Sequence, residues 1–217
     1  MPIVVSSIHS KGGAGKSTVA LSIADAFHQQ GSSVLVLDTD PQGTASEWVR
    51  AQEGEGPTAV GAPSAEKLER ELGRLGTSYD AVVIDGSAQL EGATGSVIRM
   101  SDLVLIPVQP SPADIWATES IVNLIKDRQE VVGEPAGGFV LNCVVAGTNI
   151  AGDVEEVLEE FDLPVLGRFH RRVAFVEALV TGETPLTYEP QGKAAREVKD
   201  LYSASLDALE AQYTATK

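Results

Sequence analysis

Short hydrophobic runs alternate with longer amphipathic stretches along nearly the whole chain. Hydrophobic runs of this length, bounded by glycine, proline or acidic residues, are typical of strands buried inside a sheet. We therefore predict strands at Ile3–Ile8, Val34–Asp38, Ala81–Asp85, Leu103–Val108, Phe139–Val145 and Pro164–Gly167.

The stretches between these strands carry hydrophobic residues at helical spacing. They predict helices at Lys16–Gln30, Ala45–Ala51, Ala65–Leu75, Val154–Phe161, Ala174–Val180 and Ala194–Ala211. A further helix begins at Ser111, because Ser111 can cap it, Pro112 suits its first position and Asp114 can complete a capping box. The segment Glu53–Ala62 is rich in glycine, proline and glutamate and is expected to be an exposed loop.

Strands that alternate with helices favour an α/β fold, with a mostly parallel sheet flanked by helices on both faces. Hydrophobic residues make up 43% of the 217 positions and aromatic residues only 5%, so valine, leucine, isoleucine and alanine must form the core. The chain shows no long linker. We expect residues 1–217 to form a single domain without an N-terminal helix-turn-helix extension.

Charge and rare residues narrow the possible functions. The net charge of −15 favours solubility and argues mildly against a polyanionic partner, although a local basic patch still acts within a Debye length of about 8 Å. No run reaches the ~18 hydrophobic residues of a membrane span, and no basic leader precedes the first strand, so we expect a cytoplasmic protein. The single cysteine, Cys143, rules out a disulfide framework, and its apolar strand predicts a small core residue.

The first candidate site follows the first predicted strand. Its sequence is Ser10-Lys11-Gly12-Gly13-Ala14-Gly15-Lys16-Ser17. Small residues let main-chain N–H groups face phosphate oxygens, and the following helix adds the positive end of its dipole. In such a P-loop Lys16 would reach the β- and γ-phosphates of a nucleotide, and the Ser17 hydroxyl would bind Mg²⁺. The loop therefore predicts ATP and Mg²⁺ as ligands.

This loop differs from the common P-loop at its beginning. Ser10 stands where the common pattern has glycine, and a second lysine, Lys11, follows it. The string Lys-Gly-Gly-x-Gly-Lys-Ser-Thr over Lys11–Thr18 resembles the deviant Walker A motif of the ParA/MinD family. The resemblance implies that Lys11 crosses a nucleotide-sandwiched dimer to the phosphates of the partner's ATP, in the manner of an arginine finger. His9 stands where this family usually has asparagine.

Two acidic segments extend the resemblance. Asp38-Thr39-Asp40-Pro41-Gln42-Gly43 is similar to the family's switch I segment, which implies that Asp40 orients the attacking water and that Asp38 lies near Mg²⁺. The residues alone also allow an Asp-Pro turn in which Asp40 caps a helix. Asp85 ends an apolar strand at the expected Walker B position and would hold Mg²⁺ through water. After it come Gly86, Ser87 and Ala88, where many relatives have Cys-Pro-Pro or Thr-Pro-Pro.

Further stretches resemble the small partition ATPases of the family. They are Pro107–Ala117, Arg172–Phe175 and Tyr188–Ala195. Asn142 matches the position that reads adenine, since an amide can pair with the donor and acceptor edge of that base. The other reading of Asn142 is a strand-end residue bonded to local backbone. The nucleotide contacts expected in total are Lys11, Gly12, Gly13, Ala14, Gly15, Lys16, Ser17, Thr18 and Asn142.

The resemblance implies a slow ATPase with Lys11, Lys16 and Asp40 as catalytic residues. Such an ATPase forms an ATP-dependent homodimer and coats nucleoid DNA without sequence preference. A ParB-like or equivalent adaptor on the cargo then stimulates hydrolysis; the cargo is a plasmid, a chromosome origin or a protein organelle. The residues expected to bind DNA are Arg168, Arg171, Arg172, Lys193, Arg196 and Lys199. For each of them the alternative is a solvated surface with internal ion pairs.

Other classes fit the residues less well. A MinD-type membrane regulator needs a basic amphipathic C-terminal helix, and residues 209–217 contain a single basic residue, so no membrane partner is expected. A redox enzyme like the nitrogenase iron protein needs two cysteines per subunit. The P-loop amide ligases lack the combination of Lys11 with Asp-Pro-Gln.

Overall fold

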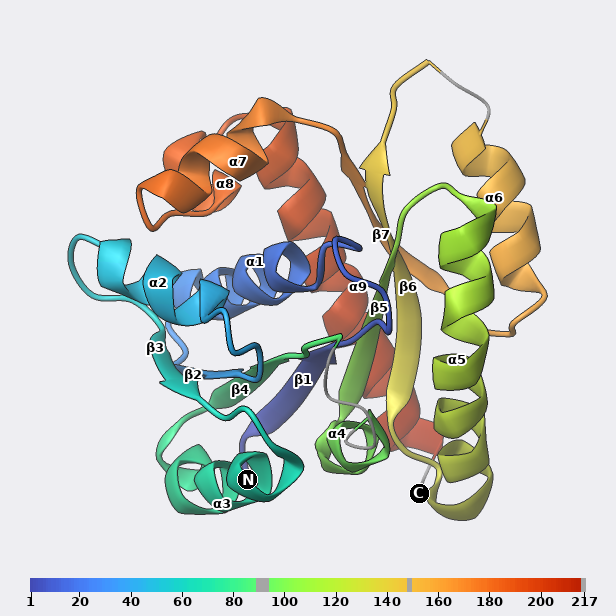
Figure 1. The fold of residues 1–217 in the computed structure, drawn as a ribbon, viewed down its shortest axis with the longest axis horizontal. Helices are drawn as coiled ribbons and strands as arrows, with labels where there is room; N and C mark the ends of the chain where they lie inside the picture. Colours follow the sequence, from blue (N-terminus) through green and yellow to red (C-terminus); the bar gives the residue numbers. More distant parts are fainter. Residues whose placement is uncertain (89–93, 148–149, 216–217) are drawn as a thin grey trace.

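A computed structural model describes residues 1–88, 94–147 and 150–215. Its strands form one seven-stranded sheet in the order β3-β2-β4-β1-β5-β6-β7, and every strand pairing described is parallel (Figure 1). The strands are β1 (Ile3–Ser7), β2 (Val34–Asp38), β3 (Thr58–Gly61), β4 (Ala81–Asp85), β5 (Leu103–Val108), β6 (Ala136–Val144) and β7 (Val165–His170). The predicted α/β class with a parallel sheet is confirmed.

Helices cover both faces of this sheet, as predicted (Figure 1). One face packs against α1 (Lys16–Gln29), α2 (Thr44–Ala51), α7 (Val173–Val180), α8 (Pro185–Tyr188) and α9 (Lys193–Ala215). The other packs against α3 (Ala65–Leu75), α4 (Thr94–Met100), α5 (Pro112–Val132) and α6 (Ile150–Glu159). A short 3-10 turn, Gly76–Ser78, follows α3.

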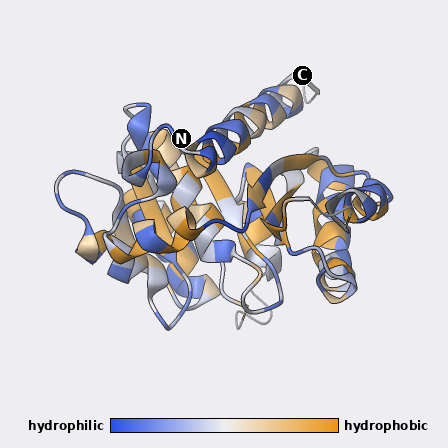
Figure 2. Ribbon diagram, turned by 90° about the horizontal axis from the view of Figure 1, so that it is seen from above, coloured by the Kyte–Doolittle hydropathy of each residue, from blue (hydrophilic) through white to orange (hydrophobic). Residues whose placement is uncertain are grey.

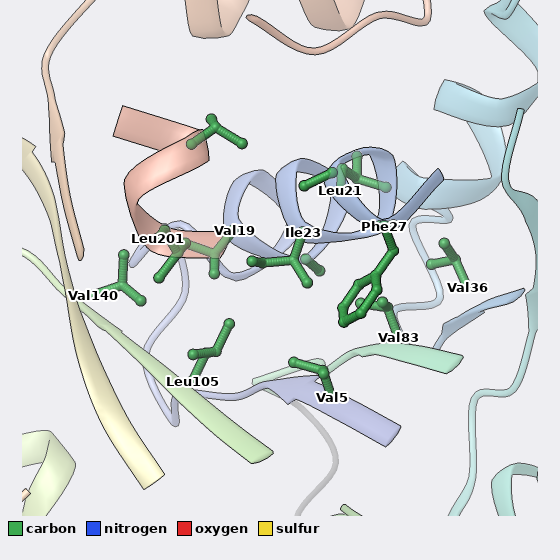
Figure 3. Close-up of a cluster of buried hydrophobic side chains, with 14 of the residues drawn as sticks. Val5, Val19, Leu21, Ile23, Phe27, Val36, Val83, Leu105, Val140 and Leu201 are labelled. Atoms are coloured by element: carbon green, nitrogen blue, oxygen red, sulfur yellow. The ribbon is translucent and has the colours of Figure 1, made fainter. Parts of the chain in front are cut away.

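The core consists of two hydrophobic layers, one on each side of the sheet. Strand residues alternate between these layers because successive side chains point to opposite faces. In Figure 3, Ile23 and Phe27 of α1 lie above Val5 of β1, and Leu201 of α9 lies near Val140 of β6. Figure 2 shows hydrophobic residues gathered on the central strands and hydrophilic residues on the outer sides of the helices. The apolar side of α9 is therefore used inside the fold.

Three short elements were not predicted from the sequence. β3 lies inside Glu53–Ala62, which was expected to be an exposed loop; it pairs with β2 alone, and its residues are partly exposed at the edge of the sheet. Helices α4 and α8 have seven and four residues, too few for a helical period to emerge from the sequence.

Cys143 corrects a prediction. It was expected to be a small core residue, but its side chain is exposed. The backbone of Cys143 has a positive φ of 57°, and the pairing of β6 with β7 shifts register between Leu141 and Val144. This irregularity breaks the inward–outward alternation near the end of β6 and turns the thiol out of the core.

Candidate nucleotide-binding site

The P-loop connects the end of β1 to the start of α1 at the middle of the sheet. Gly13 and Gly15 have positive φ values of 76° and 108°, which residues with a side chain rarely adopt. Gly15 occupies the N-cap of α1, and no side chain caps this helix. The N–H groups of its first turn are thus available to an anion, with the helix dipole behind them.

Lys16 is buried at the base of this loop. Its Nζ donates a hydrogen bond to the carbonyl oxygen of Lys11 (2.8 Å), and its own carbonyl accepts one from the Ser7 hydroxyl (3.0 Å). Burial lowers the pKa of Lys16, while the carboxylates of Asp85 and Asp40 raise it. An ammonium group inside the loop and close to two carboxylates suits the phosphates of a magnesium nucleotide.

Asn142 supports the loop from β6. Its Nδ2 donates a hydrogen bond to the Ala14 carbonyl (2.8 Å). A Cβ atom at Gly15 would lie only 2.0 Å from this nitrogen, so Gly15 is required for Asn142 to approach. Asn142 therefore makes the hydrogen bond to local backbone that was the alternative interpretation of this residue. Its contact with adenine stays a prediction.

Carboxylates from two neighbouring strands meet beside the loop. Asp38 ends β2 and Asp85 ends β4, in register with each other. Burial raises the pKa of Asp85 to about 7; the Ser17 hydroxyl, which hydrogen-bonds to this carboxyl, lowers the pKa, and the charge of Asp38 raises it. One carboxyl oxygen of Asp85, Oδ2, is buried and has no hydrogen-bond partner. A buried carboxyl with a spare oxygen beside a second carboxylate has the chemistry of a cation site.

The segment after β2 is fixed by its own carboxylates. Asp38 accepts hydrogen bonds from the Asp40 N–H (3.0 Å) and the Ser46 N–H (3.1 Å). Asp40 accepts one from the Gln42 N–H (2.9 Å), so the turn of its alternative role is present. Asp40 does not cap α2, because Gly43 occupies the N-cap and no side chain bonds there. The role of Asp40 in orienting water stays a prediction.

Thr39 joins the two acidic segments and was not singled out from the sequence. Its hydroxyl donates to the Asp85 carbonyl (2.7 Å) and accepts from the Ser87 N–H (2.7 Å). Gly86 lies so close to β1 that a Cβ atom there would be 2.8 Å from the Ser7 carbonyl oxygen. Thr39 therefore links the segment after β2 to the segment after β4 by two hydrogen bonds.

The first half of the P-loop is attached to the start of α5. Lys11 Nζ forms an ion pair with the Asp114 carboxylate, and Gln109 Nε2 donates to the Gly13 carbonyl (2.6 Å). The predicted Ser111 cap is confirmed by its bond from the Asp114 N–H (3.2 Å). Asp114 does not complete the capping box on Ser111; its carboxylate accepts from the Gln109 N–H (3.2 Å) instead.

His9, which replaces the usual asparagine, holds the main chain of the loop. Its Nδ1 accepts a hydrogen bond from the Lys11 N–H (2.9 Å), so the ring is deprotonated at Nδ1. Burial lowers the pKa of His9, whereas the charge of Asp114 raises it. The charges of Lys16 and Lys11 also lower the pKa of His9, and they thus favour a neutral imidazole.

The six predicted DNA-binding residues fall into two groups. Arg168 forms a two-pronged ion pair with Glu155 (2.5 and 2.6 Å), and Arg172 pairs with Glu197 (2.9 and 2.6 Å). Both guanidinium groups therefore have carboxylate partners within the chain. Such internal ion pairs were the alternative to DNA binding for these residues. The remaining four are exposed on the surface: Arg171, Lys193, Arg196 and Lys199.

The predicted site residues fit a magnesium nucleotide. Lys16, Ser17, Asp38 and Asp85 converge beside an uncapped helix N-terminus. Within the described ranges, no group of three or more histidine, cysteine, aspartate or glutamate residues is arranged to hold a metal ion alone. Mg²⁺ in nucleotide sites keeps water and phosphate oxygens as ligands and needs few from the protein.

Comparison with known proteins identifies the family. The family described as "CobQ/CobB/MinD/ParA nucleotide binding domain" matches residues 5–186. A protein named "Maintenance of carboxysome distribution protein A" from Gloeobacter kilaueensis is 30% identical over 217 residues, which covers 96% of this chain and 94% of the relative. A protein of the same name from Halothiobacillus neapolitanus is 29% identical over 189 residues, which covers 85% of this chain and 87% of the relative.

A solved structure has the same fold. The septum site-determining protein MinD with Mg-ADP from Pyrococcus horikoshii superposes with a TM-score of 0.73 at 20% identity, and the match covers 93% of this chain and 95% of that one. The chain therefore belongs to the CobQ/CobB/MinD/ParA nucleotide-binding family.

Proposed function

We propose that this chain is an ATPase that positions a cargo in the cytoplasm by cycling on and off nucleoid DNA. It binds ATP with Mg²⁺, forms a homodimer around the nucleotides and then binds DNA without sequence preference. An adaptor on the cargo, ParB-like or equivalent, stimulates slow hydrolysis and releases the subunits. The cargo is a plasmid, a chromosome origin or a protein organelle, and the printed names of the two carboxysome distribution relatives favour the last of these.

The observation that carries this proposal is the pair of lysines in one phosphate loop. Lys16 is buried and turned into the loop, whereas the side chain of Lys11 is 47% exposed at its mouth. One lysine suffices to hold the phosphates of a nucleotide bound to the same chain. An exposed second lysine beside them is placed to contact a nucleotide on another chain, which supports a dimer with two shared ATP sites.

Magnesium would be held by the Ser17 hydroxyl, with Asp85 and Asp38 acting behind it, and would neutralise phosphate charge during hydrolysis. Asp40 would orient the attacking water, and Lys16 would hold the phosphates in place. Asn142 would support the loop through Ala14 and would contact adenine. The whole span, residues 1–217, would act as one domain.

DNA binding is assigned to the exposed basic residues at the starts of α7 and α9. Arg172 and Lys193 line the same surface hollow, together with Glu177 and Glu189. Arg171 precedes Arg172 and is exposed. Arg168 and Arg172 hold their neighbouring segments through Glu155 and Glu197 and contribute less. The MinD-type membrane alternative has less support, because Leu201 and Leu209 of α9 face the core. In the part of the chain that the structure describes, no helix is long and apolar enough to cross a membrane.

The decisive experiment compares wild type with Lys11→Ala in sedimentation, using a slowly hydrolysed ATP analogue. Wild type should dimerise and should pellet with DNA only when the analogue is present. Lys11→Ala should keep monomeric ATP binding and lose both the dimer and the DNA binding. Lys67→Ala, an equal charge change on α3, serves as the control and should behave as wild type. A stable dimer of Lys11→Ala would refute the trans contact.

A further inference from the structure

We propose that Asp114 is a positioning residue that retains Lys11 on its own subunit and so opposes ATP-dependent dimerisation. The inference rests on the proposed function, in which Lys11 contacts the partner's nucleotide. The two residues are 103 positions apart, and their ion pair connects the mouth of the P-loop to the first turn of α5. Lys11 cannot reach a second subunit while its ammonium group stays on this carboxylate.

Asp114 has two hydrogen-bond donors besides Lys11. Its side chain is 2% exposed and also accepts hydrogen bonds from the Gln109 N–H (3.2 Å) and the Ser111 hydroxyl (3.1 Å). Burial raises the pKa of Asp114, but the hydrogen bonds from Lys11, Gln109 and Ser111 outweigh burial and leave the pKa below its ordinary value. Departure of Lys11 thus leaves a carboxylate that still has two donors.

Only the side chain of Lys11 needs to move. Its N–H is held by His9 Nδ1 (2.9 Å), and its carbonyl accepts from Lys16 Nζ (2.8 Å). The side chain itself is 47% exposed, and an ion pair open to water on one side is weak. The contact is therefore strong enough to bias the position of Lys11 and weak enough to be exchanged for the phosphates of a nucleotide.

The surroundings of the ion pair suit contact with a second copy. Trp116 lies two residues after Asp114 and is 74% exposed. The Ser10 hydroxyl donates to the Ala117 carbonyl (3.1 Å), which fixes this turn of α5 to the P-loop. Large exposed aromatic side chains are enriched where proteins meet. Release of Lys11 would thus occur at the surface that the second copy covers.

Asp114→Asn tests the inference, because asparagine keeps the shape and one acceptor oxygen but loses the charge. Asp127→Asn, an exposed aspartate on the same helix, is the matched control. Without nucleotide, the rate at which an amine-specific reagent labels Lys11, measured by mass spectrometry, should rise about two- to fivefold in Asp114→Asn only. With a slowly hydrolysed ATP analogue, Asp114→Asn should reach half-dimer at an about three- to tenfold lower protein concentration.

Two results would overturn the inference: an unchanged labelling rate of Lys11, or a dimer that forms no more readily in Asp114→Asn. If Asp114→Asn does not fold, judged by its circular dichroism melt, Asp114→Ser replaces it and supplies a hydroxyl oxygen as an uncharged acceptor. The labelling needs no dimer, so it judges the ion pair by itself. A wild type that never dimerises with the analogue would instead refute the proposed function.

Discussion

At the scale of single residues, the site depends on charges held in partly buried surroundings. Lys16 lies close to Asp85 and Asp40, and burial opposes the charge on Lys16 and on Asp85. Charges that interact away from bulk water are screened less than charges at the surface. A magnesium nucleotide would bring negative phosphates to Lys16 and a positive ion to the carboxylates. The affinity for the nucleotide should therefore fall strongly when any one of these residues is replaced.

Lys16→Ala should weaken ATP binding by roughly 100-fold or more, because the phosphates lose a charged hydrogen-bond donor in a partly desolvated site. Calorimetry with ATP and Mg²⁺ measures the change. Lys67→Ala, on α3, should bind as wild type does. An affinity of Lys16→Ala within a few-fold of wild type would mean that the loop does not cradle phosphates.

Asp85→Asn should change how stability depends on pH. The pKa of Asp85 is raised to about 7, so its contribution to stability is fully present below about pH 4 and is lost as the pH rises through 7. Asparagine cannot ionise and escapes this loss. In urea unfolding with a metal chelator, the free energy of unfolding of Asp85→Asn relative to wild type should rise by roughly 2–4 kcal/mol between pH 5 and about 8. Parallel pH profiles of the two proteins would contradict the raised pKa.

At the scale of elements, the segments after β2 and β4 form a coupled pair through Thr39. The turn at Asp40 is the most exposed part of this pair, and its carboxylate holds the Gln42 N–H. Asp40→Ala should lower ATP turnover about 100-fold, the usual range for a residue that positions or activates water, and should spare ATP binding.

Phosphate release under single-turnover conditions measures this effect, and sedimentation should show ATP dimers that persist. Asp40→Asn is the informative companion, because it keeps an acceptor for the Gln42 N–H. If Asp40→Asn restores turnover, the residue acts through its turn; if it stays as slow as Asp40→Ala, the charge itself is needed.

The elements that the sequence predicted well are those with a strong local signal. The P-loop is a contiguous string, and the buried strands that end in Asp38 and Asp85 are continuous apolar runs. β3 and α8 are too short to carry a period, and Cys143 was placed wrongly because a change of register cannot be read from composition. These failures concern tertiary pairing rather than local preference.

The same limit applied to the site. Gln109 bonds to the P-loop across 96 positions, and Asp114 pairs with Lys11 across 103. The parallel sheet places β5 beside β1 and so brings these residues together. The sequence predicted that Ser111 caps a helix. It did not predict that Asp114 of the same turn pairs with Lys11. Thr39 was hidden for the same reason, because it bonds to the main chain of a different strand.

At the scale of the whole molecule, an acidic chain must bind DNA through a small basic region. The net charge of −15 repels phosphate at long range, so the association requires clustered contacts and low salt. Arg168 and Arg172 are neutralised by Glu155 and Glu197. A dimer would double whatever contacts the exposed residues near α7 and α9 provide, which explains why DNA binding should need ATP.

Arg171→Glu together with Lys193→Glu should abolish this binding and leave dimerisation intact. Neither side chain has an ion pair within the described part of the chain, so the change should not disturb the fold, whereas a change at Arg172 would break its pair with Glu197. The control, Lys67→Glu with Arg70→Glu, makes an equal charge change on α3. It removes only the long contact of Arg70 with Glu71 (3.4 Å), and Glu71 keeps its shorter bonds from Arg74. DNA affinity with the ATP analogue should be measured over a range of salt. In wild type the logarithm of affinity should fall with the logarithm of salt by about 0.9 for each phosphate contacted, and the control should keep that slope. If the Arg171 and Lys193 variant binds like the control, the DNA surface lies elsewhere; if wild type binds no DNA with the analogue even at low salt, this chain does not use the nucleoid.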